Sequence, residues 1–138
     1  MNAEQSLGSG LDVFGRAGLN NGQVESFAYT EVDRSLEVGM ASTAPPWRRG
    51  DRLGVAFVSN GLAPDHREYL ARGGLGFLLG DGALRYGPER IIEAYYTCSV
   101  GLGLSLAADV QHIRHPGYNR DRGPATVFAL RVHLEVGP

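Results

Sequence analysis

The sequence predicts an all-β fold of long antiparallel strands, and three alternating segments in the last third of the chain carry that prediction. Successive side chains of a strand point to opposite faces of a sheet, so alternating apolar and polar residues indicate one apolar and one polar face. The clearest segment places on one face Phe128, Leu130, Val132, Leu134 and Val136. Each segment spans roughly ten residues, which is the length of a strand that crosses a bilayer and longer than a typical soluble strand. A soluble sheet packed on a core gives the same alternation, so the pattern leaves a membrane barrel and a soluble sheet open.

Six segments of the chain carry this alternation. They cover residues 11–20, 35–40, 51–60, 92–97, 104–111 and 128–136. The connections between them alternate in length, with two short ones at 44–50 and 99–103 and three long ones at 21–34, 61–87 and 113–124. Bacterial outer-membrane barrels have short periplasmic turns and long external loops. The connection lengths therefore favour a membrane barrel with every long loop on the external side.

The longest connection, 61–87, is predicted to hold a short helix. Pro64 suits the first helical position, acidic residues follow it, and Gly73 with Gly74 can end the helix in a left-handed conformation. A connection of this length has two interpretations. It folds into a barrel and narrows it, or it packs as a surface lid on its own apolar residues.

Composition and charge exclude several classes of protein. The chain has 138 residues, 43% of them apolar, and a formal net charge of −2. We expect one domain over 1–138, and the small net charge gives no reason to expect nucleic acid as a partner. No stretch approaches the roughly 18 to 20 consecutive apolar residues of a membrane helix. The single cysteine, Cys98, excludes an internal disulfide.

Motifs for catalysis or cofactor binding are weak. The histidines His112, His115 and His133 lack the spacing of a metal site, and we expect no metal there. The glycines around Gly74 and Gly80 do not follow the spacing of a dinucleotide or phosphate loop, and no serine lies in a Gly-x-Ser-x-Gly elbow. We therefore expect no cofactor and no enzymatic activity.

Several separated motifs in the second half of the chain resemble one known family. They are Gly74-Leu75-Gly76-Phe77, Gly80-Asp81-Gly82, Tyr86-Gly87-Pro88-Glu89, Glu93-Ala94-Tyr95-Tyr96 and the run Pro116 to Pro124. In this order they resemble the C-terminal part of the carbohydrate-selective porins of Gram-negative outer membranes, the OprB type, and 128–133 is similar to the closing strand of that family. The resemblance implies an antiparallel transmembrane β-barrel of sixteen strands, of which about six are present here. It also implies passive diffusion of sugars across the outer membrane.

The resemblance further implies partners and a location. Sugars are the expected substrates, outer-membrane lipid surrounds the strands, and the barrel-assembly machinery inserts them. Six strands are fewer than the eight of the smallest single-chain barrels, and residues 1–10 show no secretory signal. We therefore expect a fragment of a porin domain that does not form a pore alone. Its missing strands would come from a longer precursor or from another polypeptide.

Candidate substrate-binding residues lie on the polar face of the last three strands. Planar polar side chains bond sugar hydroxyls, aromatic rings stack on sugar faces, and opposed charges tune the selectivity of a channel. These groups are offered by Glu93, Tyr95, Asp109, Gln111, Arg131 and His133. The alternative for each residue is that it only solvates a wide polar wall. The loop 118–122 is expected to brace the barrel mouth through charge-assisted bonds rather than to bind sugar.

A second hypothesis is a small soluble β-domain that binds a ligand or partner without catalysis. Its apolar strand faces would form a core. The two hypotheses differ in one observable, because apolar side chains that face lipid stay exposed on the isolated sheet, whereas those of a soluble sheet are buried.

Overall fold

The computed structural model describes residues 1–24, 31–43, 45, 48, 50–76 and 78–136. In this part of the chain seven antiparallel strands form one sheet, and each strand pairs with its neighbours in the sequence. The elements in chain order are β1 (Asn2–Ser6), β2 (Leu11–Leu19), β3 (Arg34–Ser42), β4 (Arg52–Gly61), α1 (Pro64–Ala71), β5 (Glu89–Gly101), β6 (Leu104–Arg114), the short 3-10 helix η1 (Pro116–Tyr118) and β7 (Ala125–Leu134). The predicted all-β antiparallel fold is confirmed.

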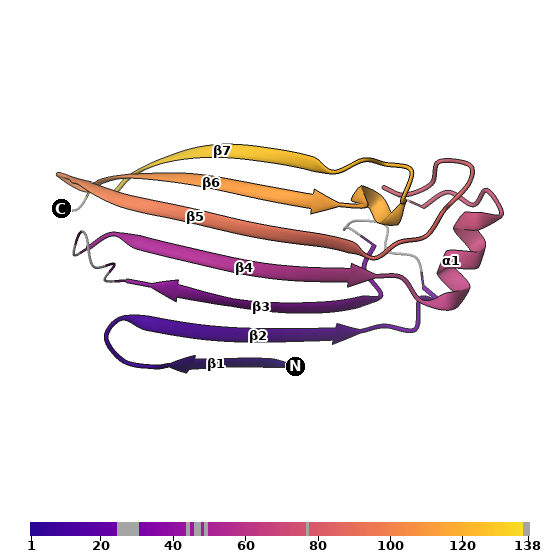
Figure 1. The fold of residues 1–138 in the computed structure, drawn as a ribbon, viewed down its shortest axis with the longest axis horizontal. Helices are drawn as coiled ribbons and strands as arrows, with labels where there is room; N and C mark the ends of the chain where they lie inside the picture. The colour runs from indigo at the N-terminus through magenta and orange to yellow at the C-terminus, as the bar shows by residue number, and fades with distance from the viewer. Residues whose placement is uncertain (25–30, 44, 46–47, 49, 77, 137–138) are drawn as a thin grey trace.

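The sheet carries its long connections at one end and its short turns at the other (Figure 1). The connections from β2 to β3, from β4 to β5 and from β6 to β7 lie at the end where α1 is found. We call this the long-loop end. The other three connections lie at the opposite end, the short-turn end. The predicted asymmetry of the loops is therefore present in the structure.

Strand β1 is an addition to the six predicted strands. Its five residues, Asn2–Ser6, are all exposed, and they pair with β2 from Asn2 opposite Arg16 to Ser6 opposite Asp12. A tight turn at 8–10, in which all three residues have positive φ, reverses the chain between the two strands. The sequence of β1 lacks apolar alternation, so pattern reasoning had no signal for it.

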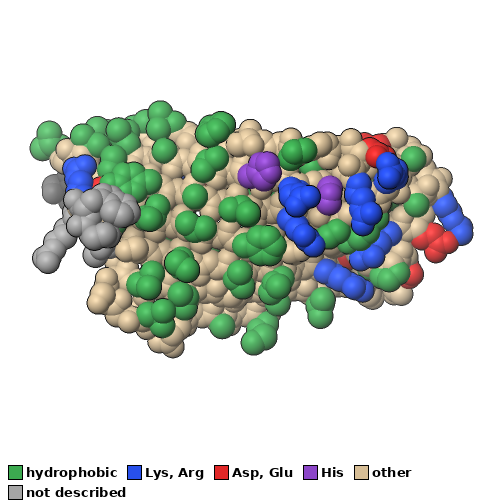
Figure 2. Space-filling view, in the orientation of Figure 1, with side chains coloured by type: hydrophobic (Ala, Val, Ile, Leu, Met, Phe, Trp, Pro, Cys, Tyr) green, Lys and Arg blue, Asp and Glu red, His purple; other side chains and the backbone are tan. Residues whose placement is uncertain are grey.

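Apolar side chains gather on one face of the sheet, which we call the outer face (Figure 2). On β7 this face carries Phe128 and Leu130, which are 78% and 76% exposed. Their partners on β6 are Val110 and Ala108, so the apolar surface continues across strands. An exposed, continuous apolar face is what a lipid-facing sheet presents, whereas the soluble alternative needs these residues in a core. Over the described residues, no such core covers this face.

The buried apolar residues lie instead at the long-loop end. Leu62, Leu70, Leu79 and Tyr118 form one cluster, and Tyr86 packs against it. The connection between β4 and β5 contributes four of these side chains, and Tyr118 comes from the connection between β6 and β7. The long connection therefore packs mainly on its own apolar residues, and the choice between a surface lid and a loop that narrows a barrel stays a prediction.

The helix predicted in that connection is present as α1. It begins at Pro64, and Gly73, with φ of +90°, follows its end. The Gly73 amide donates to the Leu70 carbonyl at 3.1 Å and the Gly74 amide to the Tyr69 carbonyl at 3.0 Å. These bonds satisfy carbonyls that the last turn would otherwise leave without partners. None of the helices in the described part of the chain has the length and apolarity needed to cross a membrane.

Candidate functional site

The six predicted site residues meet on the face opposite the apolar one, which we call the inner face. They line a concave region of about 840 Å³ over β4 to β7. The predicted residues in its lining are Glu93, Tyr95, Asp109, Gln111, Arg131 and His133. Three strands bring them together because each strand turns every second side chain to this face. Their contact with substrate remains a prediction.

Strand register sets the contacts between these side chains. Glu93 of β5 lies opposite Gln111 of β6, and Tyr95 lies opposite Asp109. The Gln111 amide Nε2 donates a hydrogen bond of 2.9 Å to Oε2 of Glu93. A carboxylate that accepts this bond still has free lone pairs for a sugar hydroxyl, because a carboxylate offers about four acceptor positions.

The ring of Tyr95 lies over Gly54 of β4. These residues are register partners, and a Cβ atom placed on Gly54 would overlap Cε1 of the ring. The ring therefore fills the space that any other residue at position 54 would need. This contact holds an aromatic ring against the wall of the concave region.

Charged side chains on the inner face lie in rows that cross the strands. Glu93 and Asp109 lie in the rows nearer the long-loop end. Arg52 and Arg131 share a row nearer the short-turn end. In this row one residue of β5 and one residue of β6 lie between them. Three strand spacings of about 4.8 Å place their backbones roughly 14 Å apart. The acidic and basic groups therefore face the same water-accessible space from neighbouring rows.

Sequence analysis missed part of this lining. Arg52 of β4 and Thr97 of β5 also line the concave region. The sequence alternation indicates both residues, because each occupies a polar position of a predicted strand. Arg52 lies outside the last three predicted strands, which supply all six candidate residues.

A second group of inner-face residues lies on β2 and β3. Arg16 Nη1 lies 3.5 Å from Oε2 of Glu37, and the Arg16 guanidinium lies 5.1 Å from the centre of the Phe14 ring. Phe14 packs over Gly39, where a Cβ atom would lie 2.6 Å from the ring. The pattern of a ring over a glycine therefore occurs twice on the inner face. Phe14 gave no sequence signal because an apolar residue on a polar face breaks the alternation.

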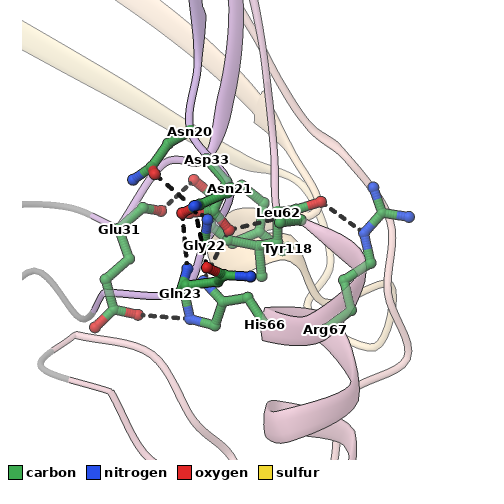
Figure 3. A network of polar contacts seen from close by, with 11 residues as sticks. Asn20, Asn21, Gly22, Gln23, Glu31, Asp33, Leu62, His66, Arg67 and Tyr118 are labelled. Carbon is green, nitrogen blue, oxygen red and sulfur yellow. Dashed lines mark hydrogen bonds and ion pairs between the residues drawn. The ribbon is translucent and has the colours of Figure 1, made fainter.

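A buried polar network joins the connections at the long-loop end of the sheet (Figure 3). His66 of α1 places Nδ1 2.9 Å from Asp33 and Nε2 3.4 Å from Glu31. Asp33 also accepts a 2.8 Å hydrogen bond from the amide of Ala63. The Tyr118 hydroxyl donates to the Glu31 carbonyl at 2.7 Å, and burial raises the pKa of that hydroxyl above its usual range. Tyr118 therefore keeps its proton and its donor role at every physiological pH.

Charge-assisted bonds brace the loop 118–122. Asp121 accepts a 2.6 Å bond from Arg85, and Asp81 accepts bonds from Asn119, at 3.0 Å, and from Arg122. The hydrogen bond from Asn119 and then that from Arg122 hold the pKa of the Asp81 carboxyl below its usual range. These bonds are of the kind predicted for this loop.

Acidic, histidine and cysteine side chains do not form a metal site in the described part of the chain. No group of three or more such residues there could hold a metal ion. His112 and His115 bond instead to the hydroxyl of Thr126 and the carbonyl of Pro88, each at 3.1 Å.

Long antiparallel strands with one exposed apolar face and one polar face define the wall of a transmembrane β-barrel. The chain belongs to the carbohydrate-selective porin, OprB family, because the model of that family matches residues 1–135. The family resemblance of the sequence motifs is therefore confirmed.

Two known proteins are similar to this chain. Porin AaxA of Chlamydia pneumoniae is 27% identical over 137 residues, which are 99% of this chain and 27% of that protein. A structure of Pseudomonas putida OprB at high pH matches with a TM-score of 0.72 and 20% identity, over 96% of this chain and 34% of that chain. At this identity the structural match shows a shared fold. The chain spans about a third or less of the length of these two relatives.

Proposed function

We propose that this chain forms part of the wall of an outer-membrane channel through which sugars diffuse passively. The inner face lines the channel, and the outer face lies against lipid. One observation carries the proposal: six residues selected as sugar ligands from the sequence line one concave region of the inner face. The name of the family, carbohydrate-selective porin, supports sugars as the substrate class.

The chemistry of the inner face suits sugars. A sugar ring has apolar C–H faces and a rim of hydroxyl groups. Tyr95 offers an aromatic face held in place by Gly54, and Glu93 with Gln111 offers hydrogen-bond acceptors and donors beside it. These groups bind hydroxyls and ring faces, so the activity that we propose for this wall is the transport of sugars.

Further strands complete the barrel in this proposal. Each of the two outermost strands of the described sheet, β1 and β7, pairs with only one other strand. Seven strands are fewer than the eight of the smallest single-chain barrels, and an unpaired edge is costly in hydrocarbon. The added strands come from the same precursor or from a second polypeptide, and the barrel-assembly machinery inserts the whole.

A chimeric porin tests this function. The part of P. putida OprB that matches this chain is replaced by residues 1–138, and single channels are recorded in planar bilayers while a sugar is titrated. We expect the sugar to reduce the ion current in a saturable way. Tyr95→Ala should weaken the apparent sugar affinity about tenfold, a loss of about 1.4 kcal/mol.

Phe128→Ala is the matched control, since it removes an aromatic side chain from the outer face of a nearby strand. It should leave the sugar affinity unchanged. An ion current that sugar does not saturate, or a Tyr95→Ala affinity equal to that of the parent chimera, would contradict the proposal.

A further inference from the structure

The outer face changes character near the long-loop end of β5 and β6. On β4 and β5 the last apolar pair of this face is Phe57 and Ile92, which are register partners. The next row toward the loops holds Ser59, Arg90 and Arg114 on β4 to β6, whereas on β3 it holds Leu36. Figure 2 shows the same change, because arginine and histidine side chains gather toward the α1 end of this face, beyond most of its apolar side chains.

The two arginines of this row face each other. Arg90 of β5 and Arg114 of β6 are direct register partners, and both are exposed. Like charges placed directly opposite on adjacent strands destabilise a sheet. Neither arginine forms an ion pair with any residue that the structure describes. An anion bound between the two guanidinium groups would turn this repulsion into attraction.

The surroundings of the pair supply hydrogen-bond donors. Ser59 of β4 is the register partner of Arg90 on the side of β5 away from β6. Its hydroxyl can donate a hydrogen bond. The carboxylate nearest in sequence, Glu89, accepts bonds from the Gly117 amide at 2.9 Å and from Asn60 at 3.5 Å. Glu89 therefore has hydrogen-bond partners other than the two arginines.

We propose that Arg90 and Arg114 together bind a phosphate group of an anionic lipid headgroup at the external edge of the membrane. The proposal rests on the proposed function, because it needs the outer face to lie in lipid. Guanidinium groups bind phosphate oxygens in a bidentate manner, and arginine at the edge of an apolar surface meets the headgroup layer.

The position of the pair favours a lipid over free phosphate. A lipid whose acyl chains cover Phe57 and Ile92 places its headgroup level with the next row. Two residues of strand separate these rows, which is about 7 Å along the strand. A single lipid can therefore contact the apolar row and the arginine pair at the same time.

Native mass spectrometry of the full chain, refolded in detergent, tests the proposal. The probes are bisphosphorylated lipid A, the same lipid without its phosphates, and inorganic phosphate. We expect the chain to retain the phosphorylated lipid, and the double variant Arg90→Gln/Arg114→Gln to bind it at least about tenfold more weakly. The double variant with lysine at both positions should bind at an intermediate level, because lysine keeps the charge without the bidentate geometry.

Arg72→Gln is the control, since it removes an exposed arginine that follows α1 in a loop, outside the strands. It should bind the lipid as the parent does. Circular dichroism confirms that each variant keeps its β-structure. Where the isolated chain does not hold its fold, the same substitutions are measured in the chimeric porin described above.

Three results would overturn the proposal. They are equal binding by the glutamine double variant, equal binding of the dephosphorylated lipid, and full displacement of the lipid by millimolar inorganic phosphate. Failure here is distinguishable from failure of the proposed function. Sugar-dependent currents report the inner face, whereas lipid retention reports the outer face.

Discussion

Nδ1 of His66 lies 2.9 Å from Oδ2 of Asp33, and this contact fastens α1 to the segment that leads into β3. The same carboxylate accepts the amide of Ala63, the residue before the helix. Asp33 is 4% exposed. The buried carboxylate of Asp33 therefore holds both Ala63 and His66 of the longest connection against the connection between β2 and β3 (Figure 3).

Removing this carboxylate should loosen the long connection. We expect Asp33→Ala to destabilise the loop packing by about 1 to 3 kcal/mol, because it leaves the buried Ala63 amide without its acceptor. Limited proteolysis of the connection between β4 and β5 measures the effect. Glu68→Ala is the control, since it breaks only an exposed ion pair with Arg72 and should cost no more than about 0.5 kcal/mol. Equal protection of Asp33→Ala and the parent would show that the network does not anchor the helix.

Gly54 should not tolerate a side chain while Tyr95 is present. Gly54→Ala would place Cβ against the Tyr95 ring, so we expect a destabilisation of about 1 to 3 kcal/mol from overpacking. Thermal unfolding of the chimeric porin in detergent measures it. The same substitution in a Tyr95→Ala background should cost much less, because the ring is gone. A cost that is independent of Tyr95 would mean that the loss comes from the backbone alone.

The two faces of β7 should respond in opposite ways to a charge. Leu130→Arg puts a guanidinium on the outer face and should destabilise the membrane-inserted chimeric porin by about 2 to 4 kcal/mol. Ala129→Arg, one residue away on the inner face, should leave the folded fraction almost unchanged, because it meets water. Folding titrations in lipid vesicles compare the two. A larger loss for Ala129→Arg would reverse the assignment of the faces.

Asp81 should titrate below the usual aspartate range. Its folded pKa is lowered first by the Asn119 hydrogen bond and then by Arg122, so its contribution to stability is present above the unfolded pKa of about 3.9. That contribution is lost as the pH falls through the lowered folded value. NMR titration of labelled aspartate carboxyls measures the midpoint. Asn119→Ala and Arg122→Gln should each raise it, and a midpoint at or above 3.9 in the parent would contradict the bonding described here.

Alternation was sufficient to predict which residues share a face. Phe128 and Leu130 were placed on the apolar face and Arg131 on the polar face from periodicity alone, and the structure confirms both. The same rule grouped the six candidate site residues, since neighbouring antiparallel strands turn their polar sides in one direction. β1 escaped detection because its residues are polar throughout and its pairing with β2 is made by the backbone.

The sequence by itself determined the two faces of the sheet, the unequal loops and the start of α1 at Pro64, because each follows from local periodicity or from the geometry of single residues. Only the tertiary structure decided which residues meet across strands. Tyr95 over Gly54 and Arg90 opposite Arg114 depend on register, and His66 beside Asp33 depends on how two loops pack. These contacts join residues 24 to 41 positions apart, and no local preference of the chain encodes them.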